Sequence, residues 1–171
     1  MHATTLPPQS AALRLHTGFA HLLDKMQPLF ALVLRLYVAR VFFASGLIKL
    51  QDWNSTLALF ANEFHVPVLP PQAAALLGTG AEIFLPVFLA LGIGTRLSAL
   101  ALFVFNIVAV ISYPDLSDAG LKDHVLWGAL LLVTLVYGPG KLALDHWLER
   151  RRFAGKDPRA AAQTARRHGS R

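Results

Sequence analysis

Glu82 is the only ionisable residue of the segment "LLGTGAEIFLPVFLALGIG", which covers residues 76–94 and is otherwise apolar or small. A carboxylate in such a segment can accept or relay a proton when a ligand lies beside it. Arg40 lies in a second apolar segment, where it can hold Glu82 ionised or bind an anionic oxygen. Glu82 and Arg40 are therefore the predicted catalytic pair, and a structural ion pair that only fixes helix packing is the open alternative.

Five other polar or aromatic residues stand near the ends of apolar segments: Lys49, Asp52, Asn106, His124 and Trp127. His124 can titrate near neutral pH, and Trp127 can stack on a planar ring. We predict that these residues line a ligand-binding cavity, although Lys, Asp and Trp also serve as ordinary anchors at a membrane surface. No metal site is predicted, because the histidines form neither an i, i+4 pair with one another nor an HExxH pattern.

Four apolar segments must position these residues, and they cover residues 28–50, 73–92, 97–113 and 124–140. Each is close to the roughly 20 residues that a helix needs to cross a bilayer. Hydrophobic residues make up 54% of the chain and charged residues 15%, whereas about 25% of the residues of a soluble domain are charged. The predicted fold is therefore all-α, an integral membrane four-helix bundle.

Two flanking segments complete the predicted organisation. Residues 1–27 hold an amphipathic helix, whose apolar residues recur at helical spacing and which is expected to lie in the membrane surface. Residues 28–145 form the transmembrane domain, and residues 146–171 form a basic, disordered cytoplasmic tail. Between the first two spans, residues 53–64 are expected to form a short surface helix.

The distribution of charge predicts the orientation. From Lys141 onward there are nine Lys and Arg residues against three acidic residues, and Arg96 lies in the short link between the second and third spans. Basic segments stay on the cytoplasmic side, so both termini are predicted to be cytoplasmic in a bacterial-type inner membrane. The net charge is +6, and the expected anionic partner of the basic residues is the layer of acidic lipid headgroups rather than nucleic acid. Because the chain has no cysteine, a redox role needs a bound cofactor or another subunit.

The depths of the charged residues in the spans predict which of them meet. Arg40 lies nine residues before Lys49, and Glu82 lies nine residues after Ala73, so each is about 13 Å inside the outer end of its helix. An unpaired charge at that depth costs at least about 2.5 kcal/mol, so Arg40 and Glu82 are expected to pair. Arg35 lies nearer the cytoplasmic end and is expected to extend to the inner headgroups.

Three stretches resemble the DoxX family of small four-helix membrane proteins: "ARVFFASGLIKLQDW", "GTGAEIFLPVFLALGIGTRLSALAL" and "GPGKLALD". The resemblance covers residues 34–145. The family pattern selects nine positions of this chain: Arg40, Gly46, Lys49, Glu82, Gly92, Arg96, Gly138, Gly140 and Asp145. The last three of these positions are expected to form a helix stop rather than a site.

The resemblance implies a place in the inner membrane and several possible roles. Some DoxX members are linked to quinone-coupled oxidation of sulfur compounds, as a small subunit of a thiosulfate:quinone oxidoreductase, and others belong to complexes that handle oxidative stress. Further members are encoded beside enzymes that modify copper-binding peptides. A thiol mechanism does not transfer to this chain, because it has no cysteine.

Two functions follow from the resemblance and the residues together. The leading one is a subunit of a redox or oxidative-stress membrane system that binds a small polar or quinone-like ligand near Arg40 and Glu82. The cofactor is left open, with quinone as one candidate. The other is a non-catalytic anchor for a partner enzyme, such as one that matures copper-binding peptides. Both need the lipid bilayer and a protein partner, and neither decides whether the chain is itself an enzyme. A small transporter is disfavoured, because no pair of broken half-repeats is visible.

Overall fold

The computed structural model describes residues 11–154, and residues 1–10 and 155–171 lie outside this range. The described chain forms six helices: α1 (Ala11–Gln51), α2 (Trp53–Asn62), α3 (Pro71–Leu91), α4 (Thr95–Ser112), α5 (Asp118–Tyr137) and α6 (Leu144–Ala154). There is no strand within this range. Helices α1, α3, α4 and α5 are long and apolar enough to cross a membrane. The prediction of an all-α membrane bundle is confirmed.

Helices α3 and α4 begin and end within two residues of the predicted limits, but α5 begins six residues earlier than predicted. The cause is a helix cap, since the Ser117 hydroxyl accepts a hydrogen bond from the Gly120 N–H at 3.1 Å. Residues 118–123, which include Asp118, Lys122 and Asp123, therefore form the first turns of α5. Hydropathy alone does not separate such turns from a loop.

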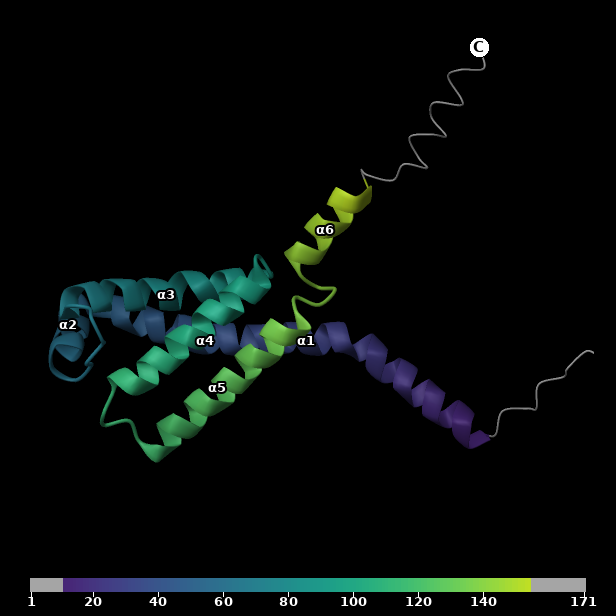
Figure 1. The fold of residues 1–171 in the computed structure, drawn as a ribbon, viewed down its shortest axis with the longest axis horizontal. Helices are drawn as coiled ribbons and strands as arrows, with labels where there is room; N and C mark the ends of the chain where they lie inside the picture. Colours follow the sequence, from purple (N-terminus) through teal and green to yellow (C-terminus); the bar gives the residue numbers. More distant parts are fainter. Residues whose placement is uncertain (1–10, 155–171) are drawn as a thin grey trace, which may run out of the picture.

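Helix α1 is one helix of 41 residues, with Pro28 inside it. The prediction of a helix near the N-terminus is correct, but the expected break before the first span is absent. Proline removes one backbone hydrogen bond and can bend a helix without ending it, as at Pro28. Figure 1 shows the purple N-terminal part of α1 turning away from the bundle, and the side chains of residues 13–27 are exposed. Its placement in the membrane surface stays a prediction.

Helix α1 packs along α3, and α4 packs along α5, so the bundle consists of two helix pairs in contact (Figure 1). The residues buried between them are Val38, Ala39, Phe42, Leu89, Ala99, Leu102 and Leu131. Gly46 sets the register of the first pair, because a Cβ atom there would lie 2.9 Å from the Glu82 Cβ and 2.9 Å from the Ile83 Cδ1. Only glycine allows the two helices to approach so closely.

One end of the bundle, which we call the α2 end, carries α2 and the link of residues 113–117. The predicted surface helix is confirmed as α2, which packs through Phe60 on the start of α3. Asp52, which was predicted to bind a ligand, caps α2. Its carboxylate accepts hydrogen bonds from the Ser55 hydroxyl at 2.6 Å and from the Ser55 N–H at 3.0 Å, which lower the pKa of Asp52.

The opposite end, which we call the α6 end, is closed by Asp145. Its carboxylate accepts hydrogen bonds from the Gly94 and Thr95 N–H groups at 2.8 Å and from the Thr95 hydroxyl at 2.9 Å. The Asp145 N–H donates to the Gly92 carbonyl at 2.9 Å. A residue that follows α5 thus caps the start of α4, whereas a helix stop was expected at this position.

The tail prediction is wrong for residues 146–154, which belong to helix α6. Polar composition predicts disorder only where no local interaction holds the chain. Here the hydrogen bonds of Asp145 tether the start of α6 to the bundle, and the Arg151 guanidinium lies 3.7 Å from the centre of the Trp147 ring. The predicted disorder of residues 155–171 concerns residues outside the described range.

Replacing Asp145 with alanine is expected to lower the free energy of unfolding by about 1–2 kcal/mol, because α4 loses its cap. Burial raises the pKa of Asp145, but the hydrogen bonds from Thr95 and Gly94 outweigh it, so the pKa is lowered overall. A carboxyl group whose pKa is lowered on folding stabilises the folded state at pH values above its ordinary pKa of about 3.9. This stabilisation is lost as the pH falls through the pKa of the folded state. Below about pH 4 the wild type should therefore lose stability more steeply than Asp145→Ala. Thermal unfolding in detergent at a series of pH values measures this, and parallel profiles would contradict it.

Candidate functional site

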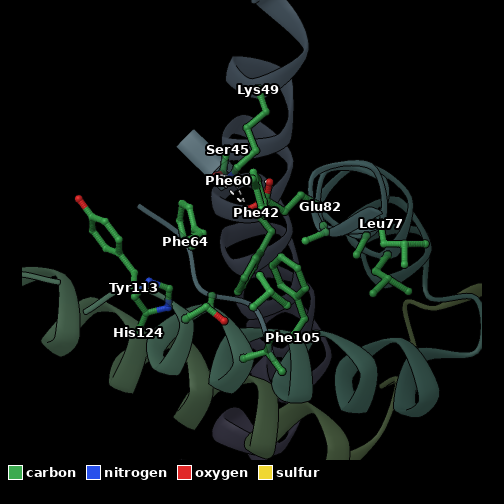
Figure 2. Close-up of a pocket in the computed structure, with 18 of the residues that line it drawn as sticks. Phe42, Ser45, Lys49, Phe60, Phe64, Leu77, Glu82, Phe105, Tyr113 and His124 are labelled. Atoms are coloured by element: carbon green, nitrogen blue, oxygen red, sulfur yellow. Dashed lines mark hydrogen bonds and ion pairs between the residues drawn. The ribbon is translucent and has the colours of Figure 1, made fainter. Parts of the chain in front are cut away.

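A cavity of about 700 Å³ lies among the four membrane helices near the α2 end. This volume is in the range that small-molecule sites occupy. Most of the wall is apolar, with the aromatic side chains Phe42, Phe60, Phe64, Phe105, Tyr113 and Trp127. The other polar groups on the wall are Ser45, Lys49, Glu82, Ser112 and His124, several of which are labelled in Figure 2. Apolar walls with a few polar groups are typical of sites that bind small molecules.

An ion pair between Lys49 and Glu82 lies in this wall. The Lys49 Nζ is 2.6 Å from Oε2 and 2.8 Å from Oε1 of Glu82, and both side chains are largely buried. Ser45 completes the cluster, since its hydroxyl accepts from Nζ at 2.9 Å and donates to Oε1 at 3.1 Å. All three donors of the ammonium group are thereby used, and Glu82 stays beside a positive charge.

The predicted pair of Arg40 and Glu82 is wrong. Gly46 is level with Glu82, so the true register of α1 against α3 differs from the one that counting from the helix ends gave. Arg40 and Lys49 are nine residues apart, which at about 100° per residue places them on opposite faces of α1. Lys49 faces the cavity, whereas Arg40 is exposed and borders a separate groove of about 280 Å³ beside Pro86. A lysine one turn from the helix end therefore takes the place expected for Arg40.

The expectation for Arg35 is also wrong, because this side chain is only 1% exposed. Its Nη2 donates to the Leu142 carbonyl at 2.8 Å, and its guanidinium packs against Gly92 at the α6 end. Arg40 is about 7.5 Å farther along the helix, and its side chain is exposed. Neither arginine pairs with Glu82, and Arg35 is held at the α6 end by the Leu142 carbonyl.

His124 and Asn106 form a second polar feature beside the cavity. The His124 Nδ1 is 2.8 Å from the Asn106 Oδ1, and the Asn106 Nδ2 donates to the His124 carbonyl at 2.9 Å. The Trp127 ring lies edge-on to the His124 ring, with 4.8 Å between centroids. Asn106 is buried behind His124 and does not line the cavity, so it acts on the site through His124.

The structure therefore brings four of the seven predicted site residues to one cavity: Lys49, Glu82, His124 and Trp127. Asn106 supports His124 from behind, while Arg40 and Asp52 lie elsewhere. The functional roles of these residues stay predictions.

Sequence reasoning missed Ser45 and a stack of aromatic rings on the cavity wall. Phe60 lies 5.0 Å from Phe64, and Phe64 lies 5.1 Å from Tyr113, measured between ring centroids. The i, i+4 spacing of Ser45 with Lys49, and of Phe60 with Phe64, was a usable signal for each pair. Tyr113 carried no such signal, because it reaches the stack from the end of α4.

The fold and this cavity define a small integral membrane protein of four spans with a ligand-sized site near one end of the bundle. The chain belongs to the DoxX family. A sequence model of that family, described as DoxX, matches residues 30–114, which run from α1 to just after α4. An uncharacterized protein of Haemophilus influenzae is 32% identical in an alignment of 128 positions that covers 70% of this chain and 83% of the relative. No solved structure matches the chain.

The nine positions selected by the family resemblance fall mainly into two groups in space. One group lies at the cavity wall: Gly46, Lys49 and Glu82. The other lies at the α6 end: Gly92, Arg96, Gly138, Gly140 and Asp145. At the α6 end Arg96 packs on Gly138, since a Cβ there would lie 3.1 Å from the arginine Nε. Thus one group belongs to the cavity, and the other joins the ends of the helices.

Proposed function

We propose that this DoxX-family membrane protein binds a quinone-type ring in the cavity, as a subunit of a redox or oxidative-stress membrane system. The observation that carries the proposal is the ion pair of Lys49 and Glu82 in the wall of an otherwise apolar, aromatic cavity of about 700 Å³. On the orientation that the basic residues predict, the α6 end faces the cytoplasm of an inner membrane, and the cavity lies in the outer half.

The cavity wall complements the two parts of a quinone. Its flat ring has apolar faces, which suit edge and face contacts with aromatic side chains such as Phe42 and Trp127, themselves 5.9 Å apart between centroids. Its ring oxygens need hydrogen-bond donors. The Lys49 ammonium group can supply one when a ring oxygen replaces Ser45 as its third acceptor.

Glu82 has two roles in this proposal. It holds the Lys49 ammonium group in place, since the two groups are in direct contact. It also provides a proton acceptor within reach of the ligand, should the ring release a proton when it is oxidised by a partner. Arg40 has no part in this site, because it lies on the opposite face of α1.

Ligand binding is tested with a variant in which Trp53 and Trp147 are replaced by phenylalanine, which leaves Trp127 as the single tryptophan of the three in the chain. Titration with a short-chain ubiquinone should quench Trp127 fluorescence in a saturable way. In the same background, Glu82→Gln should weaken binding about tenfold, because the change removes the charge that holds the Lys49 donor in place.

Arg40→Gln is the matched control, and it should leave the affinity unchanged because Arg40 lies outside the cavity. An effect of Arg40→Gln as large as that of Glu82→Gln would contradict the assignment of the site. If no quinone-type ring quenches Trp127 saturably, ligand binding fails as a function. The non-catalytic role as an anchor for a partner enzyme is then the alternative that stands.

A further inference from the structure

The orientation of the Asn106 side chain is determined by the main chain. Its Nδ2 lies 2.9 Å from the His124 carbonyl oxygen, and a carbonyl oxygen can only accept a hydrogen bond. The amide must therefore direct its NH₂ group to this carbonyl and its Oδ1 to the other side. That oxygen lies 2.8 Å from the His124 Nδ1.

The orientation of Asn106 in turn determines the tautomer of His124. The Oδ1 of an amide can only accept, so the His124 Nδ1 must carry a proton to donate. In a neutral imidazole, the other ring nitrogen, Nε2, then carries the lone pair. Within residues 11–154, no hydrogen-bond partner reaches Nε2, although the His124 ring lines the cavity. An acceptor is thus left available on the cavity wall.

We propose that Asn106 is a positioning residue that presents His124 Nε2 as a hydrogen-bond acceptor, so that the cavity binds a hydroxyl-bearing ring in preference to its oxidised form. This inference rests on the proposed function and deepens it. The wall offers an acceptor at His124 and a donor at Lys49. A hydroquinone can donate to the first through one hydroxyl and accept from the second through the other. A quinone has only acceptors and leaves His124 unsatisfied.

The surroundings hold Asn106 in this orientation. It is 4% exposed, and a Cβ atom on Gly128 would lie 3.3 Å from its Nδ2, so the amide is packed closely between α4 and α5. The Trp127 ring holds the His124 ring from the other side. The alternative is that Asn106 only joins α4 to α5. In that case the cavity would not distinguish a hydroquinone from a quinone.

The first experiment determines the tautomer of His124. The protein is labelled with ¹⁵N-histidine and studied by NMR in detergent micelles at pH 8, with the His124 signals assigned by their loss in His124→Gln. The expected result is a protonated Nδ1 and an unprotonated Nε2 in the wild type. Asn106→Asp keeps an oxygen acceptor at this position and should preserve that tautomer, whereas Asn106→Leu should abolish the preference. A protonated Nε2 in the wild type would overturn the inference.

The second experiment measures affinity without oxygen, with a short-chain ubiquinol and the matching ubiquinone as probes. The wild type should bind the quinol about fivefold more tightly, as expected for one additional hydrogen bond. In Asn106→Leu the ratio should fall to about one while the ubiquinone affinity hardly changes. Equal affinities of the wild type for both forms, or a ratio that Asn106→Leu leaves intact, would refute the selectivity.

The two proposals fail in different ways. If neither ring form binds, ring binding fails as the function, and the selectivity inferred for His124 is overturned with it, whatever tautomer the NMR spectra show. If ubiquinone binds as well as ubiquinol, the proposed function stands and only the inference about His124 is lost.

Discussion

Gly92→Ala is expected to lower the free energy of unfolding by about 3–5 kcal/mol, the largest effect of any single methyl group in the bundle. Gly92 has a φ of +71°, a left-handed conformation that costs an L-residue about 1–2 kcal/mol. A Cβ there would also lie 2.9 Å from the Ala143 Cα and would collide with the Arg35 guanidinium. Relief of that collision displaces the Arg35 bond to the Leu142 carbonyl and leaves a buried charge with fewer partners.

The matched control for this change is Gly94→Ala. Gly94 has a φ of +54°, but a Cβ there would have no atom within 4 Å. Its substitution should therefore show only the conformational cost of about 1–2 kcal/mol. Unfolding in mixed micelles of dodecyl maltoside and increasing SDS measures both variants. Equal losses for Gly92→Ala and Gly94→Ala would show that crowding at Arg35 and Ala143 contributes nothing.

Lys49→Met should destabilise the protein by about 3 kcal/mol, because it leaves the Glu82 carboxylate without its counter-charge. Glu82 is held at 2.6 Å from Nζ, and its side chain is only 8% exposed. Ser45 alone then remains to donate a hydrogen bond to the carboxylate. The wild type and Lys49→Met can be compared in the same SDS titration, with unfolding followed by the fluorescence of the three tryptophans.

The double variant Lys49→Met/Glu82→Gln tests the physical cause. Removing both charges should restore most of the lost stability, since a buried ion pair is often replaceable by neutral groups at little cost. Lys122→Met serves as a control, because Lys122 is exposed on α5 and should show no loss above about 0.5 kcal/mol. Additive losses from Lys49→Met and Glu82→Gln would mean that the two side chains do not stabilise each other.

The pairing of charges shows why the site could be predicted only in part. The sequence singled out Glu82, Lys49, His124 and Trp127, which line one cavity, because ionisable and aromatic residues stand out in apolar segments. It gave the wrong partner for Glu82, because depth counted from the helix ends carries an error of several residues. An error of that size also turns a side chain to another face of its helix.

Residues from distant parts of the chain were harder still to place together. The stack of Phe60, Phe64 and Tyr113 joins α2 to the end of α4, and the Asp145 cap joins the segment after α5 to the start of α4. Neither contact follows from local spacing. Each depends on where the preceding helix ends and in which direction the chain leaves it.

By itself, the sequence determined that the chain is a helical membrane protein of four spans, since a bilayer requires apolar segments of a given length and internally hydrogen-bonded backbone. It also determined where α3 and α4 begin and end, because proline and glycine act locally. Only the tertiary structure decided that Glu82 meets Lys49 rather than Arg40, and that Arg35 is buried. The physical reason is that pairing depends on the relative shift and rotation of two helices, which the close contact at Gly46 sets in three dimensions.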